Sequence, residues 1–158
     1  MRKPSDQMTA RPRRRFARMR QALGGFLTLL GIVWALPITL FGMLLSVPVL
    51  AMRGHLTIVA GPTPAVVVSG RLADRMLARH PFGAMWAMAI GHVVIVTQHG
   101  LTPQILSHEL AHVRQAACWG IFFPIAYLLA SGWAVVRGKD AYWHNVFEVA
   151  ARKAERHS

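Results

Sequence analysis

Residues 108–112 read His-Glu-Leu-Ala-His, and the interpretation of the whole chain starts from this pentapeptide. Residues four apart lie on one face of an α-helix, so the imidazoles of His108 and His112 can reach a single metal ion. Glu109 then lies about 100° around the helix, beside the metal, where a carboxylate can accept a proton from a bound water. The spacing predicts a metal site with Zn²⁺ as its cofactor.

The sequence on either side of the pentapeptide predicts a helix over residues 103–118. Thr102 and Pro103 are favoured at the N-cap and the first helical position, and Gly120 is a typical helix stop. Apolar residues recur on the face opposite the histidines, at Leu106, Leu110, Val113 and Ala117. One side of this helix is therefore expected to pack in a core, while the other presents the histidines to a cleft.

A catalytic zinc site needs a third protein ligand, which leaves the fourth position for water. Three residues near the C-terminus are candidates: Asp140, His144 and Glu148. A last helix is predicted over about 141–156 with Asp140 as its N-cap, so that His144 and Glu148 would project from one face.

The N-terminal part of the chain predicts attachment to a membrane. The 158 residues are 54% hydrophobic and carry a net charge of +12, and residues 26–52 contain no charge. Residues 1–24 hold eight Lys/Arg, which places them in the cytoplasm by the positive-inside rule. We therefore expect a basic tail over 1–24, a transmembrane anchor over 25–52 and a folded domain over 53–158, in a cell or inner membrane.

Other partners and cofactors are disfavoured by composition. Phe16 is the only aromatic residue among the N-terminal arginines, so no stacking platform for nucleic acid is visible. Cys118 is the only cysteine, which excludes an intramolecular disulfide and a thiolate metal site. Its thiol is expected to be buried and inert.

The folded domain is predicted to be α+β. Residues 55–60 and 65–69 are rich in Val, Ile and Thr and flank a Gly-Pro-Thr-Pro turn, which indicates a hairpin. A short helix over about 70–79 capped by Ser69 should follow, and then a strand over 91–97. The apolar segment 119–136 must turn back at Trp119-Gly120, packing against the fold or dipping into the bilayer without spanning it. Otherwise Glu148 and His112 would emerge on opposite sides of the membrane.

The pentapeptide, followed downstream by Glu148-x-x-Ala151, resembles the gluzincin clan of zinc metallopeptidases. The preceding strand, the loop and the anchor make residues 89–152 similar to the membrane-embedded heat-shock and CAAX-type peptidases and the β-lactam-sensor peptidases. The resemblance implies a minimal zincin-like domain in which His108, His112 and Glu148 bind zinc and Glu109 is the base. Those peptidases carry an aspartate that orients a ligand histidine where this chain has Arg152.

The function expected from these features is hydrolysis of peptide bonds in a peptide or protein substrate. His144 is the residue expected to support the oxyanion, although a plain polar role fits it as well. The substrate is expected to add to the edge of the strand over 91–96. Two alternatives stay open: a non-catalytic membrane protein with a structural or vestigial zinc site closed by His144, and a zinc hydrolase of a non-peptide substrate. The sequence does not indicate an oligomeric state.

Overall fold

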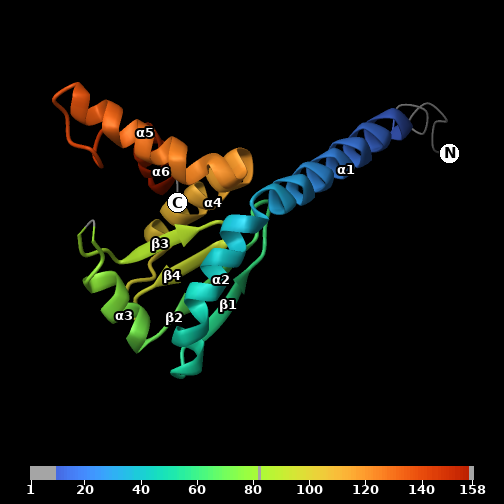
Figure 1. Ribbon diagram of the computed structural model, residues 1–158. Coiled ribbons are helices and arrows are strands. Elements are labelled where there is room, and N and C mark those ends of the chain that lie inside the picture. Colours follow the sequence, from blue (N-terminus) through green and yellow to red (C-terminus); the bar gives the residue numbers. More distant parts are fainter. Residues whose placement is uncertain (1–9, 82, 157–158) are drawn as a thin grey trace.

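The computed structural model describes residues 10–81 and 83–156, which form an α+β domain with a long N-terminal helix projecting from it (Figure 1). The order of elements is α1 (Ala10–Trp34), α2 (Leu36–Ala51), β1 (His55–Val59), β2 (Ala65–Ser69), α3 (Arg71–Ala78), β3 (Ala87–Ile90), β4 (Val93–Val96), α4 (Pro103–Trp119), the 3₁₀ turn η2 (Gly120–Phe122), α5 (Phe123–Val136) and α6 (Val146–Glu155).

The four strands form one mixed sheet in the order β1-β2-β4-β3. The predicted hairpin is confirmed: β1 and β2 pair antiparallel, with His55 opposite Ser69. β2 pairs parallel with β4, and β3 pairs antiparallel with β4. Since β4 has a partner on both sides, the free edges of the sheet belong to β1 and β3.

The two faces of the sheet carry separate cores because successive strand residues point to opposite sides. Val93 and Ile95 belong to the core beneath α2 and α3, which also contains Val49, Val68, Ala73 and Leu77. Val94 and Val96 belong to the core beneath α4, together with Ala65, Val67, Ala87 and Val113. The predicted packing of α4 through Val113 is thus confirmed.

The segment predicted as one anchor forms two helices. α1 and α2 meet at 63° around Ala35, just before Pro37. Proline lacks an N–H and its ring clashes with the preceding turn, so the chain bends here. α2 then packs on the sheet instead of continuing the line of α1.

Gly42 explains how α2 approaches the sheet so closely. It is buried with Ser46 and Val49 on one face of α2. A Cβ at this position would lie 2.7 Å from the carbonyl oxygen of Ile90, at the end of β3. The inner face of α2 therefore belongs to the folded domain, whereas its outer face exposes Leu36, Leu40, Phe41, Leu44 and Val47.

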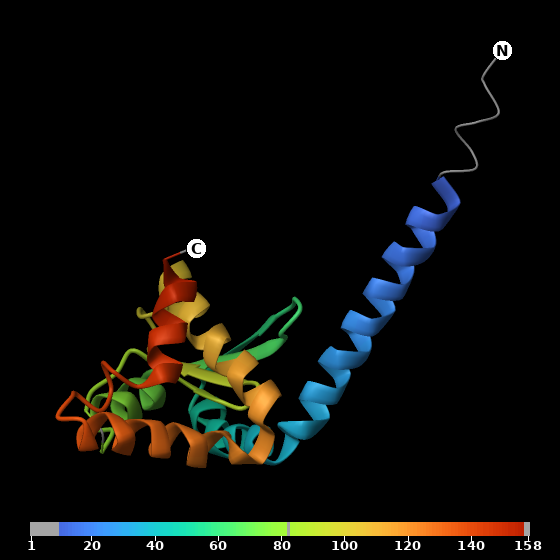
Figure 2. The same ribbon diagram turned by 90° about the horizontal axis from the view of Figure 1, so that it is seen from above.

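The chain turns back after α4, as predicted. Gly120 adopts φ 55°, and the indole of Trp34 lies where a Cβ would be. α5 leaves from this turn, and α6 returns beside α4 (Figure 2). Because α4 contacts α6 along its length, Glu148 comes back to the level of the histidines.

Two stretches of the described residues meet the length and hydropathy expected of a membrane span. One is the helical stretch Pro103–Val136, and the other is the bent pair Met19–Trp34 and Leu36–Ala51, if the pair counts as one span. The first half of Pro103–Val136 is α4, which packs on the sheet. The second half is α5, which exposes Ile125, Leu128, Leu129, Trp133, Val135 and Val136.

Three local predictions were wrong. α3 has Gly70 at its N-cap without a side-chain cap, because Ser69 is the last residue of β2. The last helix begins at Val146 with Asn145 as N-cap, whereas Asp140 caps a preceding turn by accepting from the backbone of Tyr142. Cys118 is exposed, since it lies on the side of α4 turned away from the core.

Candidate metal centre

α4 forms where its local signals predicted, and it carries two of the three groups of the site. The Thr102 hydroxyl accepts a hydrogen bond from the Ile105 backbone at 3.2 Å, which caps the helix. His112 is buried and His108 is half-buried, one turn apart on the same face. α6 supplies Glu148 from its first turn, 3% exposed.

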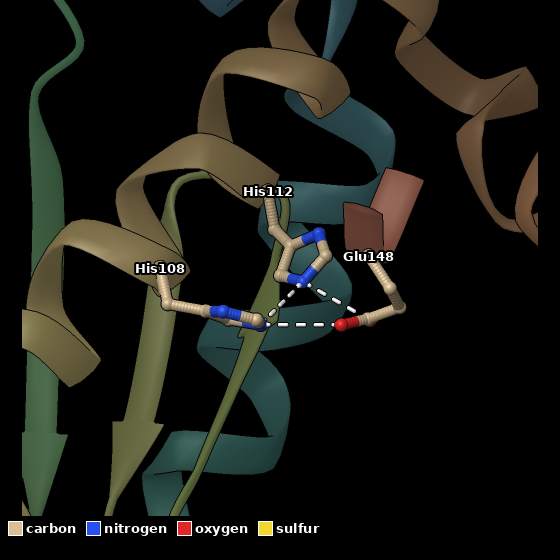
Figure 3. Close-up of side chains that lie close together, drawn as sticks. All are labelled: His108, His112 and Glu148. Atoms are coloured by element: carbon tan, nitrogen blue, oxygen red, sulfur yellow. Dashed lines mark hydrogen bonds and ion pairs between the residues drawn. The ribbon is translucent and has the colours of Figure 1, made fainter. Parts of the chain in front are cut away.

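The three side chains converge on one point (Figure 3). The Nε2 atoms of His108 and His112 lie 3.2 Å apart. The Glu148 carboxylate lies 3.3 Å from Nε2 of His108 and 3.2 Å from Nε2 of His112. The first of these distances ends on Oε2 and the second on Oε1. Ligands bound tetrahedrally to zinc at about 2.0–2.1 Å are separated by about 3.3 Å, so each of these contacts has the separation of two neighbouring zinc ligands.

The outer hydrogen bond of His112 fixes which of its nitrogens faces this point. The Gln115 amide nitrogen donates to the carbonyl of Phe147 at 3.0 Å, so its oxygen must be the atom 2.9 Å from Nδ1 of His112. That oxygen only accepts, and Nδ1 therefore carries the proton. Nε2 is left with the lone pair that a metal needs.

His108 has the same arrangement through a different residue. Its Nδ1 lies 3.4 Å from the carboxylate of Glu155, an acceptor that favours a proton on Nδ1 and a lone pair on Nε2. Glu155 lies in the last turn of α6, so both helices contribute to the support of the two imidazoles. Gln115 and Glu155 are thus the polar partners of the outer nitrogens of the two imidazoles.

Glu148 is held by tyrosines. The Tyr127 hydroxyl, from α5, donates to its carboxylate at 2.8 Å. Burial raises the pKa of Glu148, but its close contacts with His108, His112 and Tyr127 outweigh it and bring the pKa well below its ordinary value. Burial, followed by the charge and a hydrogen bond of Glu148, raises the pKa of Tyr142 to about 12. Both phenols therefore keep their protons at neutral pH.

Arg152 contacts neither of the two histidines by any hydrogen bond or ion pair among the described residues. Its guanidinium donates to the backbone carbonyl of Trp143 and lies over that indole, 4.4 Å from the ring centre. It also lies 4.0 Å from the Glu148 carboxylate, one turn away on α6. Arg152 therefore secures the 140–145 turn against α6 and adds a positive charge behind the site.

Glu109 is buried on the sheet side of the three groups. It is 6% exposed and one of its oxygens has no hydrogen-bond partner. Burial raises its pKa, against the opposing charges of His112 and His108 and a hydrogen bond from the Ala89 backbone. A carboxylate next to an edge strand and close to the histidines is suitably placed to exchange protons.

The structure does not bring the other predicted site residues into this group. His144 is exposed in the turn before α6, because the helix expected to carry it begins two residues later. Among the hydrogen bonds and ion pairs of the described site, none involves its side chain. The strand-edge prediction was also wrong: β4 is flanked on both sides, and β3 is the free edge beside α4.

The group can hold a metal by its own chemistry. Two imidazole lone pairs and a carboxylate face one another without a proton donor among them, and a buried oxygen of Glu148 has no hydrogen-bond partner. Such a set is unstable unless a cation or added protons compensate it. Two nitrogens and one oxygen match the ligands of catalytic zinc sites.

Sequence reasoning missed Gln115, Tyr127 and Glu155. Gln115 had a usable signal, since it lies one turn after His112 on the same helix. All three glutamates of the chain lie in the site, which the scarcity of acidic residues could have indicated.

No protein family, no curated protein and no solved structure matches this chain.

Proposed function

We propose that this chain is a membrane-associated zinc peptidase of the gluzincin type. The proposal depends mainly on one observation: the imidazole nitrogens of His108 and His112 and the carboxylate of Glu148 lie together, with closest contacts of 3.2–3.3 Å. Zinc, when bound, supplies a Lewis acid that polarises a carbonyl and lowers the pKa of a bound water toward about 7. The remaining chemistry falls to the chain's own residues.

Glu109 is the proposed general base and acid. Its carboxylate accepts a proton from the attacking water and delivers the proton to the leaving amine. Burial raises its pKa, which favours this exchange near neutral pH. The phenol of Tyr142, next to Glu148, is better placed than His144 to donate to a developing oxyanion. The single proton of Tyr127 is already donated to Glu148.

The proposed substrate is an extended peptide that adds to β3. The exposed edge of this strand runs beside α4, and its Ala89 backbone lies against Glu109. Backbone pairing with the edge would carry the scissile bond past the base. α1, with its basic N-terminal end, and the apolar outer faces of α2 and α5 are the proposed membrane contacts, with the N-terminus cytoplasmic.

The non-catalytic alternative requires a closed site. Structural zinc sites have four protein ligands, whereas catalytic sites keep a position open. Within residues 10–81 and 83–156, the group of possible ligands contains three residues, and the candidate fourth, His144, is exposed outside it. An open position favours the peptidase.

The test is Glu109→Gln in the full chain. Zinc per chain should stay at the wild-type level, while cleavage of a quenched fluorescent peptide mixture falls by about 10²–10⁴-fold. Asp74→Asn, on the opposite side of the sheet, removes a carboxylate without affecting either quantity. Undiminished cleavage by Glu109→Gln would exclude the assigned base. Full zinc occupancy without any cleavage by the wild-type protein would favour the non-catalytic alternative.

A further inference from the structure

A cavity lies on the other side of the sheet from the metal centre. It has a volume of about 480 Å³, within the range of small-molecule sites. Its walls come from α2, α3 and the sheet, and they are mostly apolar: Leu45, Leu72, Met76, Leu77, Met88 and Ile95. None of the metal-binding groups lines it, so the peptidase proposal does not account for it.

The mouth of the cavity is cationic. Arg75, Arg79 and His80 line it, and Arg71 continues the row one turn earlier on α3. None of the three arginines forms an ion pair within residues 10–81 and 83–156. Asp74, the one carboxylate of α3, accepts instead from the Gln98 backbone at 2.8 Å. Arginines at this spacing can bind a phosphate through several charge-assisted hydrogen bonds.

The cavity also adjoins a surface suited to lipid. Leu45 lines it from α2, and the neighbouring outer face of this helix exposes Phe41, Leu44 and Val47 by 55–65%. Leu45 thus brings the apolar wall of the cavity next to the face of α2 that a bilayer could contact. Methionine side chains, here Met76 and Met88, adapt to flexible ligands better than branched ones do.

We propose that this cavity binds one acyl chain of an anionic phospholipid, with the phosphate held by Arg75 and Arg79. The apolar walls account for the chain, the arginines for the headgroup charge, and the exposed face of α2 for the source of the ligand. The site is separate from the metal centre, and its occupation does not depend on hydrolysis.

The test uses the full chain in phosphatidylcholine vesicles containing phosphatidylglycerol with a photoactivatable diazirine at the end of one acyl chain. Labelling should map to α3 and to Met88, and diazirine-phosphatidylcholine should label these positions less. Arg75→Gln with Arg79→Gln should reduce the phosphatidylglycerol labelling by about tenfold or more, because both charged donors to the phosphate are lost. Arg137→Gln with Lys139→Gln, which removes the same charge at the end of α5, should not.

Met76→Trp should fill the cavity and suppress labelling independently of the arginines. His112→Ala should leave labelling unchanged, which separates this proposal from the peptidase. Labels confined to α1 and the outer face of α2 would overturn the cavity site. Equal labelling by the two lipids, or an arginine variant that labels like wild type, would overturn the anionic headgroup.

Discussion

The helices on the two faces of the sheet differ in the kind of side chain that they bury. On the α4 side, polar groups with partners lie between α4, α5 and α6: Gln115 and Glu155 contact the two imidazoles, and Tyr127 donates to Glu148. Beneath α2 and α3 the core is apolar, and a glycine at position 42 brings a helix backbone onto the strands. The candidate metal-binding groups therefore lie on one side of the sheet, while the other side is packed by apolar side chains.

The largest expected effect is the loss of bound zinc when Glu148 is replaced. In Glu148→Ala two imidazoles remain, and two protein ligands are too few for a catalytic zinc site. Zinc per chain, measured by atomic emission on purified protein, should fall to background. Asp140→Ala and His144→Ala remove the candidate ligands that the structure leaves outside the site, and both should retain zinc. Loss of zinc in His144→Ala would show that the turn before α6 closes onto the metal.

On the opposite face of the sheet, the packing of α2 should be disrupted by a side chain at Gly42. In Gly42→Val the new side chain meets the Ile90 carbonyl, a backbone atom that cannot move aside without disturbing β3. Overpacking of this kind costs about 3 kcal/mol, measurable as a shift of the denaturation midpoint in detergent. Gly25→Val is the matched control, because nothing lies within 4 Å of that position on α1. Equal stability of the two variants would mean that α2 is only an anchor.

Removing the hydroxyl of Tyr127 tests how much its hydrogen bond to Glu148 contributes to metal binding. Tyr127→Phe keeps the ring that packs against His112 and deletes the hydrogen bond to the Glu148 carboxylate. Loss of such an outer partner typically weakens metal binding by about 10–100-fold, which competition with a chelator can measure. Tyr142→Phe should have a smaller effect because Tyr142 is 52% exposed. Unchanged affinity in Tyr127→Phe would remove α5 from the description of the site.

The sequence was informative where local signals agreed. The cap at Thr102, the stop at Gly120 and the histidine spacing all describe one helix, and α4 has these bounds within a residue. The hairpin is similarly local. Glu148 was also predicted to lie beside the histidines, because a metal site of this type needs a third ligand.

The sequence was uninformative about features that depend on how distant segments pack together. An uncharged helix looks the same whether it faces lipid or a sheet, so the packing of α2 through Gly42 could not be seen. Asp140 is as good a cap as Asn145, but its carboxylate is used by the turn over 140–144. Tyr127 reaches Glu148 only because α5 turns back, which no short-range pattern records.

The smallest expected change is in stability, when the residues before α4 and α3 lose their side-chain hydroxyls. Thr102 caps α4 with its side chain, so Thr102→Ala should destabilise the chain by about 1 kcal/mol. Ser69, which the sequence suggested as the cap of α3, ends β2 instead, and Ser69→Ala should lie within about 0.5 kcal/mol of wild type. Denaturant midpoints of the two variants, measured under identical conditions, give the comparison directly. A larger loss in Ser69→Ala than in Thr102→Ala would mean that α3 begins one residue earlier than Arg71, with a serine cap.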